Sequence, residues 1–363
     1  MTQENVLRQK AEILYKEELK ALKAVDDRPK PPNWQLSPWA VVRYILGGKI
    51  NDQLEIEPKY FGNRRIIELA VSTLVTDRAL LLTGIPGTAK TWVSEHLTAA
   101  ISGDSSMLVQ GTAGLSEEAL RYSWNYAQLI AKGPSEEALV PSPVMRAMQE
   151  GKLVRVEELT RIPSDVQDGL LTILSEKVLP VAELNLQIQA LKGFNLIATA
   201  NDRDKGVNEL SSALQRRFNI IVMPLPSNLE EEVKIVKSRV DKLGLELQLP
   251  EKNSPVEEIN RLVTIFRELR SGKREDNHEK IKSPSSTLST AEAISVFHSG
   301  QALATHFGNG VVGAKDLASS LTNAIIRDSE QDKSIWREYL ETVVKVRSDW
   351  KDLYEACIES LKT

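Results

Sequence analysis

The chain has 363 residues, enough for two or three domains with a full hydrophobic core. Its 46 lysines and arginines oppose 50 aspartates and glutamates, and a formal net charge of −4 gives no overall attraction to nucleic acid. The one cysteine excludes a disulfide framework and a zinc site built on cysteines. Early charged residues exclude an apolar signal core, and no apolar run approaches the roughly 20 residues of a membrane span. We therefore expect a soluble, cytoplasmic protein with no membrane partner.

The first part of the chain predicts helices joined by a stiff linker. Apolar residues recur at helical spacing from Glu4 to Val25, and the segment "DDRPKPPNW" then breaks the chain. Ser37 is a typical N-cap before Pro38, and Gly47 a typical stop, for a short helix. A further helix is expected from about Asn63 to Thr76.

From there, predicted strands and helices alternate as far as Leu225. The strands are expected at Ala79–Thr83 and within "SMLVQGT", "LVRVEE", "FNLIATAN" and "NIIVMPLP". Helices are expected after the glycine loop and at 116–132, 163–176 and 208–217. Such alternation indicates an α/β fold with a parallel sheet covered on both faces. Alternating apolar residues between Lys177 and Lys192 predict a β-hairpin inserted before the fourth strand.

The chain after Leu225 predicts helices only. They are expected at 228–244, 255–269, 289–306 and 314–327 and suit a helical lid domain. The charged segment "RSGKREDNHEKIKSPSS" predicts a mobile loop within it. From Lys333 onward an apolar stripe predicts one long amphipathic helix, which packs against the lid or a neighbouring subunit. The expected parts are an N-terminal arm and linker (1–60), an α/β core (61–226), a helical lid (227–330) and a C-terminal helix (331–363).

The stretch "LLLTGIPGTAKTW" resembles a phosphate-binding loop of the pattern G-x-x-x-x-G-K-[S/T]. Gly84, Lys90 and Thr91 are in place, whereas Ala89 stands where the second glycine is usual. A predicted strand leads in and a predicted helix leads out, which is the context that such a loop needs. We expect Ala89 to open the helix with a negative φ, so that alanine fits, and we expect Gly84 and Gly87 to carry the turn.

This loop predicts contacts to the phosphates of ATP. Backbone N–H groups and the helix dipole would hold the phosphates, and Lys90 would reach the β and γ oxygens. The hydroxyl of Thr91 would bind Mg²⁺. Nucleotide contacts are expected from Gly84, Ile85, Pro86, Gly87, Thr88, Ala89, Lys90, Thr91 and Trp92.

Two acids end the strand of "LVRVEELTR", about seventy residues further on. An acid that organises Mg²⁺, followed by one that polarises water, is what hydrolysis of a nucleoside triphosphate requires. We expect Glu157 to hold Mg²⁺ through water and Glu158 to orient the attacking water. Glu157 is one methylene longer than the usual aspartate. A solvent-facing acidic strand end would be common by itself, and the loop at this spacing favours the catalytic interpretation.

Two further motifs each have a functional and a structural interpretation. Asn201 ends an apolar strand, where its amide could contact the γ-phosphate and the attacking water, or simply form a turn. Arg216 and Arg217 precede the fifth strand. An arginine there can reach a neighbouring subunit's nucleotide and stabilise transition-state charge, while one of the two serves in an ion pair within the chain.

The segments "GIPGTAKT", "VEELTRIPSDVQDGLL", "FNLIATAN" and "ALQRRF", in this order, resemble an AAA+ ATPase of the MoxR type. The resemblance covers about Phe61 to Leu321. It implies an αβα sandwich with a five-stranded parallel sheet, an all-α lid, ATP with Mg²⁺, and a ring that is usually a hexamer. It also implies that alanine before the lysine is the family's own form. It places Phe61 and Gly62 near the adenine.

The sequence departs from the family pattern at three places. Glu157 stands where the family has aspartate. The family's D-R-F reads R-R-F here, so that Arg217 matches the arginine finger and Arg216 replaces an acid. Thr290 stands near the position of the lid arginine called sensor 2, and the replacement of that arginine by threonine predicts slow hydrolysis.

Three functions remain open. The leading hypothesis is a ring ATPase that remodels protein partners like a chaperone, and the family suggests a protein with a von Willebrand A domain as the partner. The second is a nucleic-acid motor, which the hairpin disfavours because it has no basic residue between Val178 and Leu191. The third is a scaffold gated by nucleotide with slow turnover.

Overall fold

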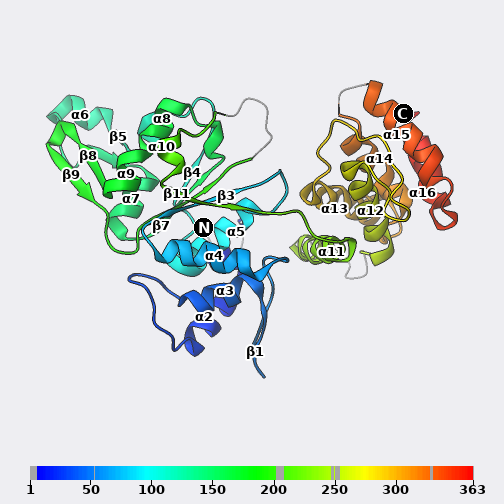
Figure 1. The fold of residues 1–363 in the computed structure, drawn as a ribbon, viewed down its shortest axis with the longest axis horizontal. Helices are drawn as coiled ribbons and strands as arrows, with labels where there is room; N and C mark the ends of the chain where they lie inside the picture. The colour runs from blue at the N-terminus through cyan, green and yellow to red at the C-terminus, as the bar shows by residue number, and fades with distance from the viewer. Residues whose placement is uncertain are drawn as a thin grey trace. The chain divides into compact units, whose positions relative to one another are not determined.

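A computed structural model shows the fold of residues 6–52, 54–201, 208–246, 249, 254–327 and 330–362 (Figure 1). The chain divides into two compact units. The first unit comprises Met1–Ile85 and Ala89–Pro224, and the second comprises Leu225–Thr363 with the three loop residues Pro86–Thr88. Within the described ranges, no helix is both long and apolar enough to cross a membrane.

The first unit is built on a five-stranded parallel sheet, which confirms the predicted fold class. The strand order is β11-β3-β10-β7-β4. The strands are β3 (Ala79–Thr83), β4 (Leu108–Gln110), β7 (Leu153–Glu157), β10 (Asn195–Thr199) and β11 (Phe218–Val222). Every residue of β3, β7 and β10 is buried. Continuous buried strands are typical of a parallel sheet that helices cover on both faces.

The order of the strands brings three loops to one edge of the sheet. From β3 the chain passes through α5 (Lys90–Ser102) to β4 at the far edge, returns to β7 and β10, and then crosses β3 to reach β11. Strands β3, β10 and β7 are therefore parallel neighbours. Their carboxyl ends come out together, which is where parallel α/β sheets bind ligands.

The N-terminal segment contains more elements than its sequence pattern predicted. These are α1 (Ala11–Leu14), α2 (Lys16–Val25), α3 (Pro38–Leu46), the hairpin β1 (Gly48–Asn51) and β2 (Leu54–Ile56), and α4 (Arg64–Val75). The single helix predicted from Glu4 is two helices, because Tyr15 leaves the helical conformation; Glu4 itself lies outside the described residues. The predicted caps of α3 are confirmed, since Ser37 accepts a hydrogen bond from the Ala40 N–H and Gly47 has a φ of 68°.

The helix predicted at 116–132 is wrong. The chain there forms a 3-10 turn (Glu117–Ala119), strand β5 (Tyr122–Trp124) and helix α6 (Tyr126–Lys132). Strand β5 pairs with β6 (Leu139–Pro141), after which α7 (Pro143–Glu150) follows. The aromatic residues of β5 favour pairing over a helix, and Asn125 then caps α6 by accepting from the Gln128 N–H.

The predicted hairpin between Lys177 and Lys192 is confirmed. Strand β8 (Val178–Val181) pairs antiparallel with β9 (Leu186–Gln189). The helix predicted at 163–176 is two helices, α8 (Ser164–Asp168) and α9 (Leu170–Glu176). The helix predicted at 208–217 is shortened to α10 (Ser212–Gln215), because the Ser211 side chain caps it at the Leu214 N–H.

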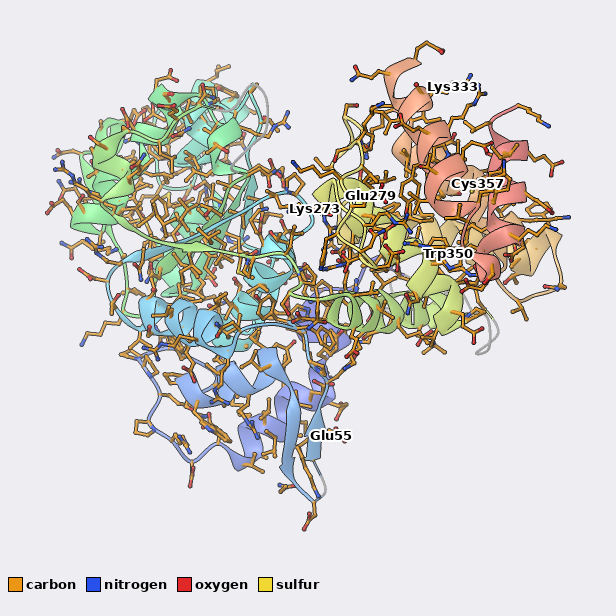
Figure 2. All side chains as sticks on the ribbon, turned by 45° about the vertical axis from the view of Figure 1, so that its right-hand side comes forward. Glu55, Lys273, Glu279, Lys333, Trp350 and Cys357 are labelled. Carbon is orange, nitrogen blue, oxygen red and sulfur yellow. The ribbon has the colours of Figure 1, made fainter. Side chains whose placement is uncertain are left out.

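The second unit contains helices that share one apolar core. They are α11 (Leu229–Glu246), α12 (Val256–Ser271), α13 (Thr290–Phe307), α14 (Ala314–Ile325), α15 (Glu330–Tyr339) and α16 (Lys351–Ser360). The apolar stripe of the tail packs into this core, for example through Trp336 and Trp350. Cys357 lies on α16 (Figure 2). It is fully buried in this core, and burial raises the pKa of its thiol to about 12.

The C-terminal tail is not the single helix that we predicted. A π-helical turn (Leu340–Val344) and a 3-10 turn (Ser348–Trp350) separate α15 from α16. Between these turns Arg347 has an extended backbone, and its guanidinium donates to the buried carboxylate of Glu268 at 2.6 Å. This buried charge pair favours a break in the helix where uninterrupted amphipathic spacing predicted none.

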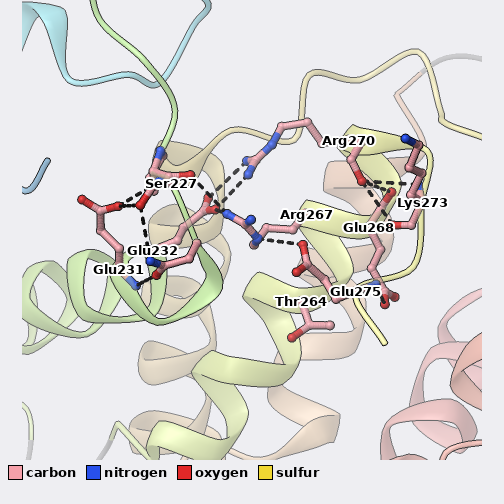
Figure 3. Close-up of polar contacts among 12 residues, drawn as sticks. Ser227, Glu231, Glu232, Thr264, Arg267, Glu268, Arg270, Lys273 and Glu275 are labelled. Atoms are coloured by element: carbon pink, nitrogen blue, oxygen red, sulfur yellow. Dashed lines mark hydrogen bonds and ion pairs between the residues drawn. The ribbon is translucent and has the colours of Figure 1, made fainter. Parts of the chain in front are cut away.

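The charged segment predicted to be a mobile loop folds back on α12. Lys273 and Lys280 form an isolated β-bridge. Arg267 pairs with Glu275 at 2.9 Å, as Figure 3 shows. The hydrogen bond from Arg274 lowers the pKa of Asp276 to about 2. Specific ion pairs therefore organise a segment that is poor in apolar residues.

Candidate active site

The glycine loop follows β3 and leads directly into α5, as its sequence predicted. Gly84 and Gly87 have φ values of 139° and 81°, which confirms that they carry the turn. The ammonium of Lys90, the first residue of α5, donates to the carbonyl oxygens of Gly84 and Ile85 at 2.8 Å each. The loop thus holds a buried positive charge at the N-terminus of a 13-residue helix. Both features favour the binding of an anion such as phosphate.

The backbone conformation of Ala89 differs from the prediction. Its φ is 64° and its ψ is 20°, in the left-handed region, where a negative φ was predicted. The helix does not begin at Ala89. Ala89 is its N-cap, and a left-handed residue there turns the loop into the helix. A side chain in this region costs about 1–2 kcal/mol, so alanine is strained here rather than relaxed.

We therefore expect Ala89→Gly to stabilise the protein by up to about 1 kcal/mol, because relief of the left-handed strain exceeds the entropy that glycine loses on folding. Urea unfolding followed by circular dichroism measures the change. Ala99→Gly is the matched control, since Ala99 lies buried inside the same helix, where glycine costs about 1 kcal/mol. Equal destabilisation by the two variants would contradict the strain at Ala89.

Glu157 lies at the end of β7 and is joined to the loop. The Thr91 hydroxyl donates to its Oε2 at 2.9 Å, and the Thr199 hydroxyl of β10 donates to the same oxygen at 2.5 Å. Its side chain is 2 % exposed. A hydroxyl beside a carboxylate is an oxygen donor set that suits Mg²⁺, which usually takes one or two carboxylates together with phosphate oxygens. Thr91 and Glu157 therefore fit the metal predicted for them.

Glu158 and Asn201 lie side by side at the ends of neighbouring strands. The Asn201 amide donates to both carboxylate oxygens of Glu158, at 3.2 and 3.3 Å. The backbone of Glu158 is left-handed with a φ of 56°, and its N–H donates to the Thr199 hydroxyl. Because of this strained turn, the side chains of the two adjacent acids have different surroundings. Glu157 is buried, and Glu158 is half-buried.

Trp92 links the loop helix to the segment that precedes α4. Its indole N–H donates to the Lys59 carbonyl at 2.8 Å, and its ring centroid lies 4.2 Å from that of His96. Phe61 and Gly62 follow Lys59 by two and three residues, so they lie on the strand-to-helix connection that Trp92 holds. Phe61 is half-buried and Gly62 is exposed. Their predicted contact with adenine stays a prediction.

The structure distinguishes Arg216 from Arg217 at the C-terminal end of α10. The Arg217 guanidinium donates to the Ser175 hydroxyl and to the Ala213 carbonyl, both at 2.8 Å. Arg216 is exposed, and among the described residues its side chain forms neither a hydrogen bond nor an ion pair. Arg217 therefore has the structural contacts, and Arg216 has an exposed side chain.

Comparisons with known proteins identify the family of this chain. A family described as "AAA domain (dynein-related subfamily)" matches residues 79–218, and "YehL-like AAA+ ATPase C-terminal domain" matches residues 230–359. The uncharacterized protein YehL of Escherichia coli (strain K12) is 40 % identical over 353 residues, which are 95 % of each chain. The chain belongs to the YehL-like AAA+ ATPases.

More distant likenesses are limited to the fold or to part of the chain. An uncharacterized protein of Staphylococcus aureus (strain USA300) is 29 % identical over 149 residues, which span 55 % of its length. NtrX from Brucella abortus in complex with ADP superposes with a TM-score of 0.51 at 13 % identity, over 82 % of this chain and 64 % of NtrX. At that identity the likeness shows the fold alone.

The sequence patterns missed the residues that surround Glu157 in this YehL-like ATPase. Besides Thr199, Ser94 donates to Oε1 at 2.5 Å and Arg155 pairs with Oε1 at 3.2 Å. Arg155 had a detectable signal, because a charged residue inside an otherwise apolar strand is unusual. No sequence signal pointed to Ser94, since a serine inside a helix is common.

Thr290, at the position expected for the lid arginine, has a role within the second unit. Its hydroxyl donates to Glu232 Oε1 at 2.7 Å, and both residues are buried. Arg267 and Arg270 donate to the same carboxylate, as Figure 3 shows for the two arginines. Thr290 thus completes a buried network around Glu232.

Proposed function

We propose that this protein binds ATP with Mg²⁺ and hydrolyses it. The observation that carries the proposal is the hydrogen bond from Thr91 to Glu157. It joins the phosphate-type loop to an acid 66 residues away, which a chance loop match would not do. ATP and ADP complexes of NtrX, a protein of the same fold, support the choice of nucleotide.

The residues then have separate tasks in hydrolysis. Lys90 and the N-terminus of α5 hold the phosphates, and Thr91 with Glu157 would hold Mg²⁺, which supplies positive charge to the phosphate oxygens. Glu158 orients a water and takes its proton as the oxygen attacks the γ-phosphorus and the bond to ADP breaks. Asn201 keeps the Glu158 carboxylate in place. In the lid, Thr290 stands where the sensor 2 arginine is expected, and it bonds to Glu232 together with Arg267 and Arg270. Because this arginine is replaced, we propose slow turnover.

We further propose that the protein forms a ring of the MoxR type, usually hexameric, that remodels a protein partner. The exposed Arg216 supports a contact in trans, because its guanidinium is available to a neighbour's γ-phosphate. The β8–β9 hairpin has no basic residue, which supports a protein partner over nucleic acid. The family resemblance suggests a protein with a von Willebrand A domain.

We expect Arg216→Ala to lower phosphate release per subunit at least about tenfold and to leave ATP affinity unchanged, because a trans arginine stabilises charge that develops only in the transition state. Arg217→Ala should mainly lower stability, since its guanidinium is bonded to Ser175 and Ala213. Steady-state phosphate release and thermal unfolding of both variants measure the two effects.

The wild-type rate per subunit should also rise with protein concentration, because the trans contact requires assembly. If Arg217→Ala abolishes turnover and Arg216→Ala does not, then Arg217 is the trans arginine. If neither variant changes turnover and the rate per subunit is independent of concentration, the ring proposal is wrong.

A further inference from the structure

Arg155 is a charged residue inside a strand that is buried along its whole length. Its side chain is 6 % exposed. A guanidinium in such a place needs a counter-charge, because an unpaired buried charge is strongly unfavourable. Glu157 supplies it. The two residues are two positions apart on β7, and alternation along a strand puts them on the same face.

The two oxygens of Glu157 have different partners. Oε1 accepts from the Ser94 hydroxyl at 2.5 Å and from Arg155 Nη1 at 3.2 Å. Oε2 accepts from the hydroxyls of Thr91 and Thr199. Arg155 also donates to the Ser105 carbonyl at 3.1 Å, which fixes the guanidinium itself. Oε1 is therefore held by Ser94 and Arg155, and Oε2 is bonded to Thr91, the residue expected to bind the metal.

We propose that Arg155 is a positioning residue that, together with Ser94, anchors Glu157 Oε1 and so keeps Oε2 beside Thr91, the residue that would hold Mg²⁺ with Glu157. The inference rests on the proposed function of the site. It also gives a reason for glutamate at this position. An aspartate is one methylene shorter, so from the same backbone it cannot keep the contacts with both Ser94 and Thr91.

The consequence is a change in the Mg²⁺ requirement of nucleotide binding. Removing a partner that orients a metal ligand typically costs about 10–100-fold in metal affinity. The readout is the affinity for the fluorescent nucleotide mant-ADP, which we expect Mg²⁺ to increase. We define the Mg²⁺ requirement as the MgCl₂ concentration that gives half of this increase. We expect Arg155→Met to raise the Mg²⁺ requirement about tenfold. Binding of mant-ADP without Mg²⁺ should not change, because Arg155 contacts neither the loop nor Lys90. A purely structural role would lower thermal stability without this shift.

Two serines of α5 provide a matched comparison. Ser94→Ala removes the other anchor of Oε1, so it should raise the Mg²⁺ requirement as Arg155→Met does. Ser102 is also buried and also bonded to β7, where its hydroxyl accepts from the Leu153 N–H at 2.9 Å, but it lies at the opposite end of the strand. Ser102→Ala should lower stability and leave the Mg²⁺ requirement as in the wild type. Arg155→Lys retains the charge and should give an intermediate value.

A double-mutant cycle with Glu157→Asp tests whether Arg155 acts through Glu157. In the Glu157→Asp background, Arg155→Met should change the Mg²⁺ requirement less than about twofold, because the anchor is already lost. An unchanged requirement in Arg155→Met, or in Arg155→Lys should the methionine variant not fold, would overturn the inference. Full additivity in the cycle would overturn it as well. Failure of the wild type to bind mant-ADP would instead refute the proposed function.

Discussion

Lys90→Ala should lower the affinity for ATP about 100-fold or more, because charge-assisted hydrogen bonds to phosphate contribute about 1.5–3 kcal/mol each. The Lys90 ammonium is buried against the Gly84 and Ile85 carbonyls, so the substitution removes both the charge and a contact that shapes the loop. Isothermal titration calorimetry with ATP and MgCl₂ measures the loss.

A charge control comes from Lys132, which is exposed at the end of α6. Lys132→Ala removes the same charge from the chain and should bind ATP as the wild type does. Thermal unfolding of Lys90→Ala checks that the fold is retained. Affinity within threefold of the wild type in folded Lys90→Ala would refute the assignment of the loop as the phosphate site.

Glu158→Gln should lower steady-state phosphate release about 10²–10⁴-fold while ATP still binds, because a neutral amide cannot take the proton of the attacking water. Glutamine has nearly the shape of glutamate, so the contact with Asn201 is disturbed little. Glu118→Gln is a suitable control, since Glu118 is exposed and outside the site. Equal rates in the wild type and Glu158→Gln would show that another group activates the water.

The main elements of the site could be predicted from the sequence because each had a local signal. The loop pattern identified Gly84, Lys90 and Thr91, and the apolar strands identified the acids and Asn201 that follow them. Parallel strands whose loops emerge at one edge then bring these residues together. The fold class followed from the same alternation of strands and helices.

The conformation of Ala89 could not be predicted in this way. The prediction assumed that Ala89 opens the helix and so has a negative φ, whereas Ala89 is the N-cap and lies in the left-handed region. The partners of Glu157 were missed for a different reason. Ser94 and Thr199 come from a helix and another strand, and only the packing of those elements puts their hydroxyls beside the carboxylate.

The errors outside the site also come from tertiary contacts. Tyr122 and Trp124 pair with β6 instead of continuing a helix, and the choice depends on partners that lie 19 and 15 positions further along the chain, at Pro141 and Leu139. Arg347 breaks the C-terminal helix because its guanidinium pairs with Glu268, a residue of α12. Local spacing carries no information on either contact.

The nucleotide that stays on the purified protein tests the central claim most directly. Wild type, Glu158→Gln and Lys90→Ala are incubated with ATP and MgCl₂ and separated from free nucleotide by gel filtration, and the bound nucleotide is identified by chromatography. We predict ADP on the wild type, ATP on Glu158→Gln and none on Lys90→Ala. The same nucleotide on all three proteins, or none on the wild type, would contradict an ATPase site built from Lys90 and Glu158.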